Sequence, residues 1–474
     1  MTAFPVGVLT ERPRHGGPSE RTWRLLAIAS VIVATVVSIV VALGATGPAF
    51  PYDEIDQLQM SRMIAGLDTP EIRGAGYFPA WAFLLAPLWW ITSDAFVMYH
   101  AAIWIGLVLG LVAILPLAHL ARRLRLTFSQ GVFAAAVVVT LPAVAIQADY
   151  ALSERLLLLF VALTAVAACR LWERPSALHA VLFSLAVAAT YFTHVRVLPL
   201  VLAAGVWLAL FALRNWRVAA IGLASLILFA LAAHQAGNAL NIALLGEFSQ
   251  GEGLLDTLRA SRPGLLLRSG LGQAWTQVVG TLGIAAIGLV ALTVWTWREL
   301  RRLRAGRATF LFATIAGMYL LTTIKWASDY HLFTRPWHRL DTWLYGRYID
   351  PLTSLLVLIG IALIIRGVRR STVLWAGAIS LAIILPTVLW VAIDAPTWGY
   401  VTPAHIPGVT PWHGLLPEEQ FPDGTRLLPS FTNENSFWVW ASLTAIVALV
   451  VILLLRRFHA TLAVLVLAAA AAMS

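Results

Sequence analysis

Long apolar segments constrain the fold of this chain more than any other feature of its sequence. Hydrophobic runs of about 18 or more residues recur along its length, and each is long enough to cross a hydrocarbon layer of roughly 30 Å. Hydrophobic residues make up 60% of the 474 positions, so the several soluble domains that this length would otherwise suggest are not expected. We therefore predict an all-α polytopic membrane protein.

The distribution of arginine predicts the topology. Basic clusters in short loops mark the cytoplasmic side, so we assign the formal charge of +10 to membrane orientation and expect no nucleic-acid partner. The apolar segment Tyr77–Ile91 decides the arrangement. It is short, holds two prolines, and would place the next arginine cluster, 122–125, outside if it crossed the membrane. We interpret it as an interfacial or re-entrant helix that does not span.

This choice gives about 13 spans, with a cytoplasmic N-terminus and an external C-terminus. Residues 1–22 are expected to form a disordered cytoplasmic tail, because prolines, glycines and arginines recur there. A single integral membrane domain, 23–474, follows, with long external loops at 46–96, 241–270, 326–350 and 394–436. The predicted spans are 22–45, 97–121, 130–147, 154–171, 178–193, 196–213, 217–240, 271–297, 308–325, 351–366, 371–393, 437–455 and 458–474.

Acidic residues gather on the predicted external side. Most of the 23 carboxylates fall in external loops or at the external ends of spans, although acids have little influence on topology. Their concentration on one face indicates that the site lies there, on the external face of a bacterial plasma (inner) membrane. The single cysteine, Cys169, excludes a disulfide or a cysteine-based metal site within one chain.

Three carboxylates, Asp53, Glu54 and Asp56, follow the first span within four residues. A structural interpretation makes Asp53 a helix N-cap and places Glu54 favourably at the positive end of the helix dipole. The stripe Met60–Leu67 has the spacing of an amphipathic helix at a membrane surface. The functional interpretation is a general base beside an acceptor hydroxyl, and it is compatible with the first because a capped residue has a fixed position. Asp56 is assigned a structural role.

This stretch resembles the GT-C glycosyltransferases, integral membrane enzymes that take sugars from polyprenyl-phosphate donors. The resemblance is carried by Asp53-Glu54, by the amphipathic stripe, and by the aromatic segment Tyr77–Trp81 with its proline. It is greatest for the protein-mannosyl and aminoarabinose transferase branch, except that the single Pro79 stands where that branch has a Pro-Pro pair. The first third of the chain shows it well, and the remainder shows it mainly through topology.

Two further external turns carry candidate residues. Ser153-Glu154 could simply begin a helix, but the resemblance implies that Glu154, with Asp149, orients the acceptor or a divalent cation. Mg²⁺ or Mn²⁺ would prefer such oxygen ligands, Asp53 included, and the family uses a metal in some branches only, so no cofactor is assigned. Arg196, at the start of a span, is costly unless it pairs with an external acid or with donor phosphate.

Cations recur in the segment from Lys325 to Asp350, on the side where the orientation rule disfavours them. Arginine offers a two-pronged donor set to phosphate, so this departure fits the binding of a lipid-linked phosphate. The stretch Tyr345–Tyr348 also resembles a Gly-Arg-Tyr element of GT-C relatives. We expect Arg347 first, and then Arg339 and Lys325, to bind phosphate.

The resemblance implies transfer of a sugar from a polyprenyl-phosphate donor to a hydroxyl of a glycan, lipid or protein, with inversion at the sugar. Asp53 would be the base, Glu54 its neighbour or alternate, and Glu154 would orient the acceptor. Two alternatives stay open. One is a polysaccharide polymerase or ligase that relies on Arg347, His338 and His413; the other is a transporter or flippase, which predicts acids and broken helices near the bilayer midplane.

Overall fold

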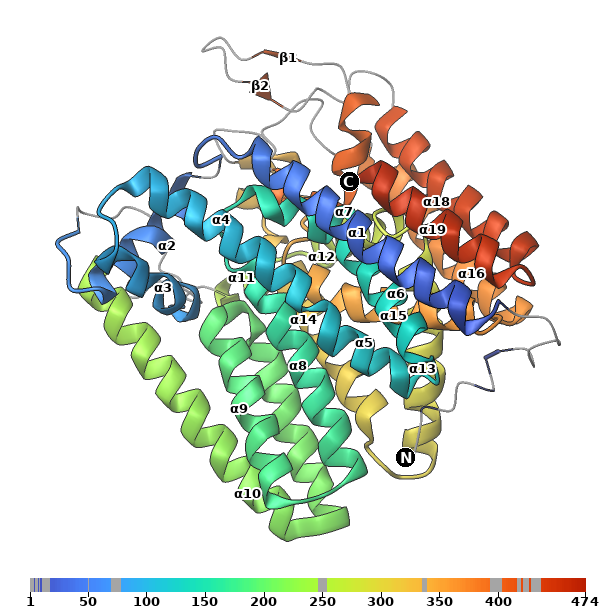
Figure 1. Cartoon of the computed structure of the whole chain (residues 1–474), viewed down its shortest axis with the longest axis horizontal. Coiled ribbons are helices and arrows are strands. Elements are labelled where there is room, and N and C mark those ends of the chain that lie inside the picture. The colour runs from blue at the N-terminus through green and yellow to red at the C-terminus, as the bar shows by residue number, and fades with distance from the viewer. Residues whose placement is uncertain are drawn as a thin grey trace.

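The computed structural model places the helices of this chain side by side in one bundle (Figure 1). A two-stranded antiparallel sheet pairs β1 (Glu419–Gln420) with β2 (Arg426–Leu427). The residues that the structure describes are 4, 7, 9–10, 18–49, 51–69, 78–245, 254–334, 339–392, 403–415, 419–420, 426–427 and 436–474. Within these ranges the chain is almost wholly helical, so the all-α prediction is confirmed.

The longer helices account for most of the bundle. Among the described residues, seven helices are long and apolar enough to cross a membrane, or up to nine if each of two bent pairs is one span. The predicted count of about 13 spans is therefore not confirmed, although a multi-pass protein is. The helices that make up most of the bundle, candidate spans and others together, are α1 (Glu20–Gly44), α4 (Ala95–Val112), α6 (Phe128–Thr140), α8 (Glu154–Glu173), α9 (Ala177–Thr193), α10 (Leu198–Leu245), α12 (Pro263–Val279), α13 (Ile284–Arg301), α14 (Arg307–Trp326), α15 (Asp350–Ile365), α16 (Arg370–Pro386), α18 (Ser436–Leu455) and α19 (His459–Met473).

The remaining helical segments connect or extend these helices. They are α2 (Pro51–Ile64), α3 (Ala80–Leu85), α5 (Ile114–Arg123), α7 (Pro142–Ala145), α11 (Leu254–Ala260), the 3₁₀ segments η2 (Ala86–Trp90), η3 (Ile146–Asp149), η4 (Val195–Val197), η6 (Leu340–Thr342), η8 (Pro403–His405) and η9 (Pro407–Leu415), and the π-helical η5 (Tyr330–Thr334) and η7 (Thr387–Val391).

One predicted span is wrong as drawn. The segment 271–297 is two helices, α12 and α13, which meet at an angle of 109°. The break falls at Leu282 and Gly283, whose φ values of +53° and +74° both lie in the left-handed region, which glycine adopts without strain. A hydropathy pattern does not reveal this break, because the residues on both sides of it are apolar. A second predicted span, 130–147, bends by 70° where Pro142 opens α7.

The segment predicted not to span is described from Phe78 onward, as α3 with six residues and η2 with five. Both are too short to cross a bilayer. Two of its tryptophans instead fix neighbouring elements. Trp89 donates from Nε1 to Ser61 Oγ of α2 at 2.7 Å, and Trp81 donates from Nε1 to the backbone oxygen of Ala151 at 3.1 Å. Helix α2 and the segment of α3 and η2 are thereby packed together and against the turn before α8.

Helix α15 is the centre of the bundle and anchors the segment that carries Arg347. Every residue of α15 is buried. Its packing against α13 depends on glycine: a Cβ at Gly288 would lie 2.0 Å from the backbone oxygen of Leu356, and one at Gly360 would lie 2.4 Å from that of Ile284. Small residues allow such close approach of helix backbones in membrane proteins.

The amino-terminal tail is not disordered where the structure describes it. Phe4 is buried, its ring lies 4.9 Å from that of Trp295, and the Arg307 guanidinium lies 4.0 Å from its ring centre. Thr10 forms a β-bridge with Val368. The expectation of disorder followed from proline, glycine and arginine content and overlooked the apolar anchor at Phe4.

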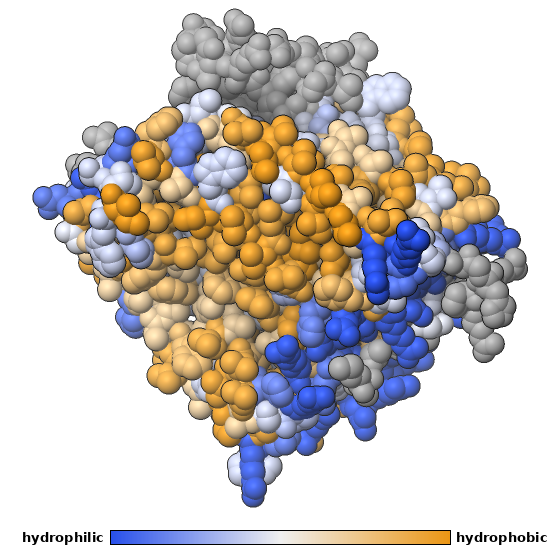
Figure 2. Space-filling model, viewed as in Figure 1, coloured by the Kyte–Doolittle hydropathy of each residue, from blue (hydrophilic) through white to orange (hydrophobic). Residues whose placement is uncertain are grey.

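The surface has the character of a membrane protein. Figure 2 shows a broad hydrophobic face, and hydrophilic side chains gather at one end of it. Many large apolar side chains of the long helices are exposed, among them Ile28, Ile32 and Val36 of α1. Exposure on this scale fits contact with lipid. The C-terminal turns of α5 and α13 both carry arginines, as the predicted cytoplasmic loops require.

Candidate active site

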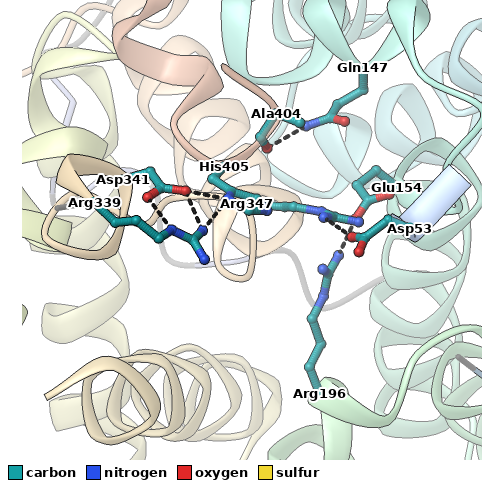
Figure 3. A network of polar contacts seen from close by, with 9 residues as sticks. All are labelled: Asp53, Gln147, Glu154, Arg196, Arg339, Asp341, Arg347, Ala404 and His405. Carbon is teal, nitrogen blue, oxygen red and sulfur yellow. Dashed lines mark hydrogen bonds and ion pairs between the residues drawn. The ribbon is translucent and has the colours of Figure 1, made fainter. Parts of the chain in front are cut away.

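Four charged side chains from distant segments meet in one cluster (Figure 3). Arg347 donates from Nη1 to Asp53 Oδ2 at 2.7 Å and from Nε to Glu154 Oε1 at 2.5 Å. Arg196 donates from Nη2 to the same oxygen of Glu154 at 3.1 Å. The helix starts of α2 and α8, the segment η4 and the approach to α15 supply one residue each. We call these four residues the charge cluster.

The charge cluster is removed from solvent. Its side chains are 2% exposed for Arg347 and Arg196, 5% for Glu154 and 13% for Asp53. Two carboxylates face two guanidinium groups, so the formal charges balance. Loss of one member of such a buried set leaves another charge uncompensated, which typically costs about 3–5 kcal/mol. The arrangement is therefore sensitive to any single substitution.

Arg196 retains hydrogen-bonding capacity inside this site. Its Nε and Nη1 atoms are buried and form no hydrogen bond within the part of the chain that the structure describes. Its guanidinium carbon lies 4.9 Å from the centre of the Tyr348 ring. Unpaired donors at such depth are costly, and they suit an anionic ligand.

Glu54 lies beside the charge cluster and has a different contact. Its side chain is fully buried, and its Oε2 accepts a hydrogen bond from the backbone N–H of Ala151 at 2.7 Å. This bond ties α2 to the turn that leads into α8. Asp149, predicted to bind the acceptor, ends η3 in the same turn and forms no ion pair with described residues.

A second cluster adjoins the first. Arg339 donates from Nε and Nη2 to the two carboxylate oxygens of Asp341, at 2.9 and 2.6 Å. His405 Nδ1 lies 2.5 Å from Asp341 Oδ2 and must carry the proton, because a carboxylate only accepts. Burial alone would raise the pKa of Asp341, but the Arg339 charge and the bonds from His405 and Arg339 hold it at about 2. Arg339, a predicted phosphate ligand, is thus bound to Asp341.

His405 links the two clusters through its backbone. Its carbonyl oxygen accepts hydrogen bonds from the N–H groups of Gly346 at 2.9 Å and Arg347 at 3.1 Å. The preceding Ala404 accepts a bond of 3.5 Å from Gln147 Nε2. The proline-rich segment 403–415 therefore rests on the residues that position Arg347. From this segment the sequence had singled out only His413, for the alternative polymerase mechanism, and not His405, since backbone acceptors leave no signature in composition.

Lys325, the third predicted phosphate ligand, lies in the last turn of α14. It is next to Trp326, whose ring lies 4.5 Å from that of Tyr345. His338, assigned to the alternative polymerase mechanism, lies outside the described residues.

The described donor set does not fit a divalent cation. No group of three His, Cys, Asp or Glu side chains that could hold a metal occurs in the described ranges. The predicted metal ligands, Asp53 and Glu154, each direct an oxygen to Arg347. A guanidinium therefore takes the place that Mg²⁺ or Mn²⁺ would need.

A small cavity of about 20 Å³ adjoins Glu154. Three acceptors that lack a hydrogen-bond partner in the described chain belong to residues lining it: Gln147 Oε1, Glu154 Oε2 and Asp350 Oδ2. The Nε of Arg155, another lining residue, is an unpartnered donor. The volume and this mix of donor and acceptors suit one ordered water.

No family model and no curated protein matches the chain. Solved structures do match it. ArnT from Cupriavidus metallidurans bound to undecaprenyl phosphate is 14% identical over 96% of this chain and 75% of its own, with a TM-score of 0.48. The archaeal oligosaccharyltransferase AglB from Archaeoglobus fulgidus, in complex with an inhibitory peptide and a dolichol-phosphate, is 14% identical over 78% of this chain and 56% of its own, with a TM-score of 0.43. The likeness is one of overall fold.

Proposed function

We propose that this protein transfers a sugar from a polyprenyl-phosphate donor to an acceptor hydroxyl at the charge cluster. The observation that carries the proposal is the convergence of Arg347 and Arg196 on Asp53 and Glu154 in a buried site. Such a site offers cations for a phosphate and a carboxylate for a proton, which are the two groups that this transfer needs. The resemblance of the Asp53-Glu54 loop to GT-C enzymes adds the substrate class.

The roles follow from the chemistry of the groups. The acceptor oxygen attacks C1 of the sugar while its proton passes to Asp53, and the bond from C1 to the phosphate oxygen breaks. Polyprenyl phosphate leaves as an anion, so stabilisation by Arg347 and Arg196 matters more than a general acid. In-line attack inverts the configuration at C1. Glu154 keeps both guanidinium groups in place.

The contacts favour Asp53 over Glu54 as the base. Glu54 is fully buried and accepts the Ala151 N–H, a structural bond between α2 and the turn before α8. Asp53 is the more exposed carboxylate and lies in the first turn of α2. Glu54 would then support the loop that carries the base.

The proposal includes the orientation inferred from arginine. The N-terminus would lie in the cytoplasm and the charge cluster at the external face of the plasma membrane. A donor lipid could then present its phosphate to Arg347 from the bilayer, and the acceptor glycan, lipid or protein would approach from outside.

Asp53→Asn and Glu54→Gln variants test the proposal by transfer assay with polyprenyl-phosphate sugars. We expect Asp53→Asn to lower the rate by about 10²–10⁴-fold, the usual contribution of a general base. Glu54→Gln should lose less, because a glutamine oxygen can still accept the Ala151 N–H. Asp94→Asn is the matched control, since Asp94 caps α4 and asparagine is an equally good cap. Full activity in both variants would refute the mechanism.

A further inference from the structure

In this structure the charge cluster has no net positive charge for an added anion to neutralise. Arg347 is 2% exposed and is engaged by both carboxylates, and the four formal charges already balance. A donor phosphate that joined the intact set would bring a negative charge without a partner, which is costly in a buried site. Binding by exchange for one of the carboxylates avoids this cost.

The contacts distinguish the carboxylate that can leave. Glu154 receives donors from both Arg347 and Arg196 and is 5% exposed. Within the part of the chain that the structure describes, Asp53 has one ion pair, to Arg347 Nη1, and it is 13% exposed. Departure of Glu154 would break ion pairs with two guanidinium groups, whereas departure of Asp53 would break the ion pair with one. Asp53 is therefore the exchangeable ligand of Arg347.

We propose that Asp53 occupies, in the ligand-free protein, the position on Arg347 that the donor phosphate takes. This inference rests on the proposed function. The phosphate displaces Asp53 from Nη1 of Arg347 and reaches the buried Nε and Nη1 of Arg196, which have no hydrogen-bond partner in the described chain. The exchange keeps the charge of the Arg347 site unchanged.

The exchange also changes what Asp53 can reach. In the ligand-free protein its Oδ2 is held by the N–H of Arg347. Once the donor phosphate has taken this place, both oxygens of the carboxylate can turn toward an acceptor hydroxyl.

Equilibrium binding of undecaprenyl phosphate to the purified full-length protein in detergent tests the exchange. Asp53→Asn removes the competing charge, so this variant should bind undecaprenyl phosphate about tenfold more tightly than the wild type, even though it loses transfer activity. The matched control is Asp149→Asn, which removes a nearby carboxylate that has no ion pair with described residues. Its affinity should equal that of the wild type.

Three results would overturn the exchange and leave the proposed function standing: unchanged or weaker binding by Asp53→Asn, an equal gain in Asp149→Asn, or the same gain for undecaprenol, which lacks the phosphate. Absence of saturable binding by the wild type and by both variants, each checked for folding by thermal unfolding, would contradict the proposed donor itself. The two failures are thus distinct.

Discussion

Asp53 and Asp56 lie one turn apart on α2 and have opposite surroundings. Asp53 bonds to Arg347, whereas Asp56 Oδ2 is buried without a hydrogen-bond partner in the described chain. Burial, and secondarily the neighbouring charge of Asp53, raises the pKa of Asp56 to about 7. The sequence predicted a structural role for Asp56. Its surroundings make its contribution to the free energy of unfolding depend on pH.

Asp56→Asn should stabilise the protein at pH 8 and change little at pH 5. In the unfolded chain this carboxyl ionises near its ordinary value of 3.8, so between that value and about 7 the folded state binds more protons. The free energy of unfolding therefore falls as pH rises through this window. We expect the melting temperature in detergent to rise by roughly 1–3 °C at pH 8. A gain at pH 5 as large as at pH 8 would exclude this explanation.

Much of the charge cluster was predictable residue by residue, but its pairing was not. Arg347 stood out as a cation on the side where the orientation rule disfavours it, and Asp53 and Glu154 as acids in external turns. Their mutual contacts join residues 294 and 193 positions apart, and no periodicity encodes such distances. The same holds for Arg339, whose charge the sequence showed but whose ion pair with Asp341 it did not.

At the scale of elements, the segment that begins at η8 positions the site. His405 bonds to Asp341 through Nδ1 and supports the N–H groups of Gly346 and Arg347 through its carbonyl. The bond from His405 Nδ1 to Asp341 holds in place the His405 carbonyl that accepts the N–H of Arg347. His405 is thus a positioning residue that would act through Arg347.

Replacement of His405 tests this coupling. His405→Asn keeps an N–H donor near the position of Nδ1 and should retain most transfer activity. His405→Leu should raise the KM for the lipid donor by about tenfold, with a smaller change in kcat, because Arg347 loses its alignment toward the phosphate. His100→Leu on α4 is the control. Equal defects in both His405 variants, or a loss explained wholly by a lower melting temperature, would argue against positioning.

Helix existence was more predictable than helix continuity. The apolar runs gave the long helices, and the segment that holds Pro79 and Pro87 is divided into the short helices α3 and η2. The break between α12 and α13 escaped prediction because it depends on left-handed backbone at two consecutive residues, Leu282 and Gly283, within an apolar run. Backbone conformation at these two residues outweighed hydrophobicity there.

At the scale of the whole molecule, the amino-terminal tail joins separate parts of the bundle. Phe4 packs against Trp295 of α13 and Arg307 of α14, and Arg369 donates to the carbonyl of Thr10 at 3.2 Å. The tail therefore contributes to stability at the end of the bundle rich in arginine. The composition of the tail predicted disorder because prolines, glycines and arginines outnumber its apolar residues. Composition does not show that a single one of these, Phe4, is buried.

Phe4→Ala should lower the melting temperature and leave the site intact. Loss of a buried phenylalanine costs about 3–5 kcal/mol at most, and less where a terminal segment can detach. We expect a decrease of a few degrees in detergent, with unchanged affinity for undecaprenyl phosphate. Phe458→Ala, at a ring that is 62% exposed, is the control and should have no effect. An unaltered melting temperature in Phe4→Ala would show that the tail does not stabilise the bundle.

A structure of the protein with undecaprenyl phosphate in a lipid nanodisc tests the central claim most directly. The measured quantity is the position of the phosphate relative to the charge cluster. We predict the phosphate within hydrogen-bond distance of Arg347 and Arg196, with Asp53 no longer bonded to Arg347 and turned toward the acceptor side. A phosphate bound elsewhere, with the bond between Asp53 and Arg347 intact, would contradict the assignment of this cluster as the active site.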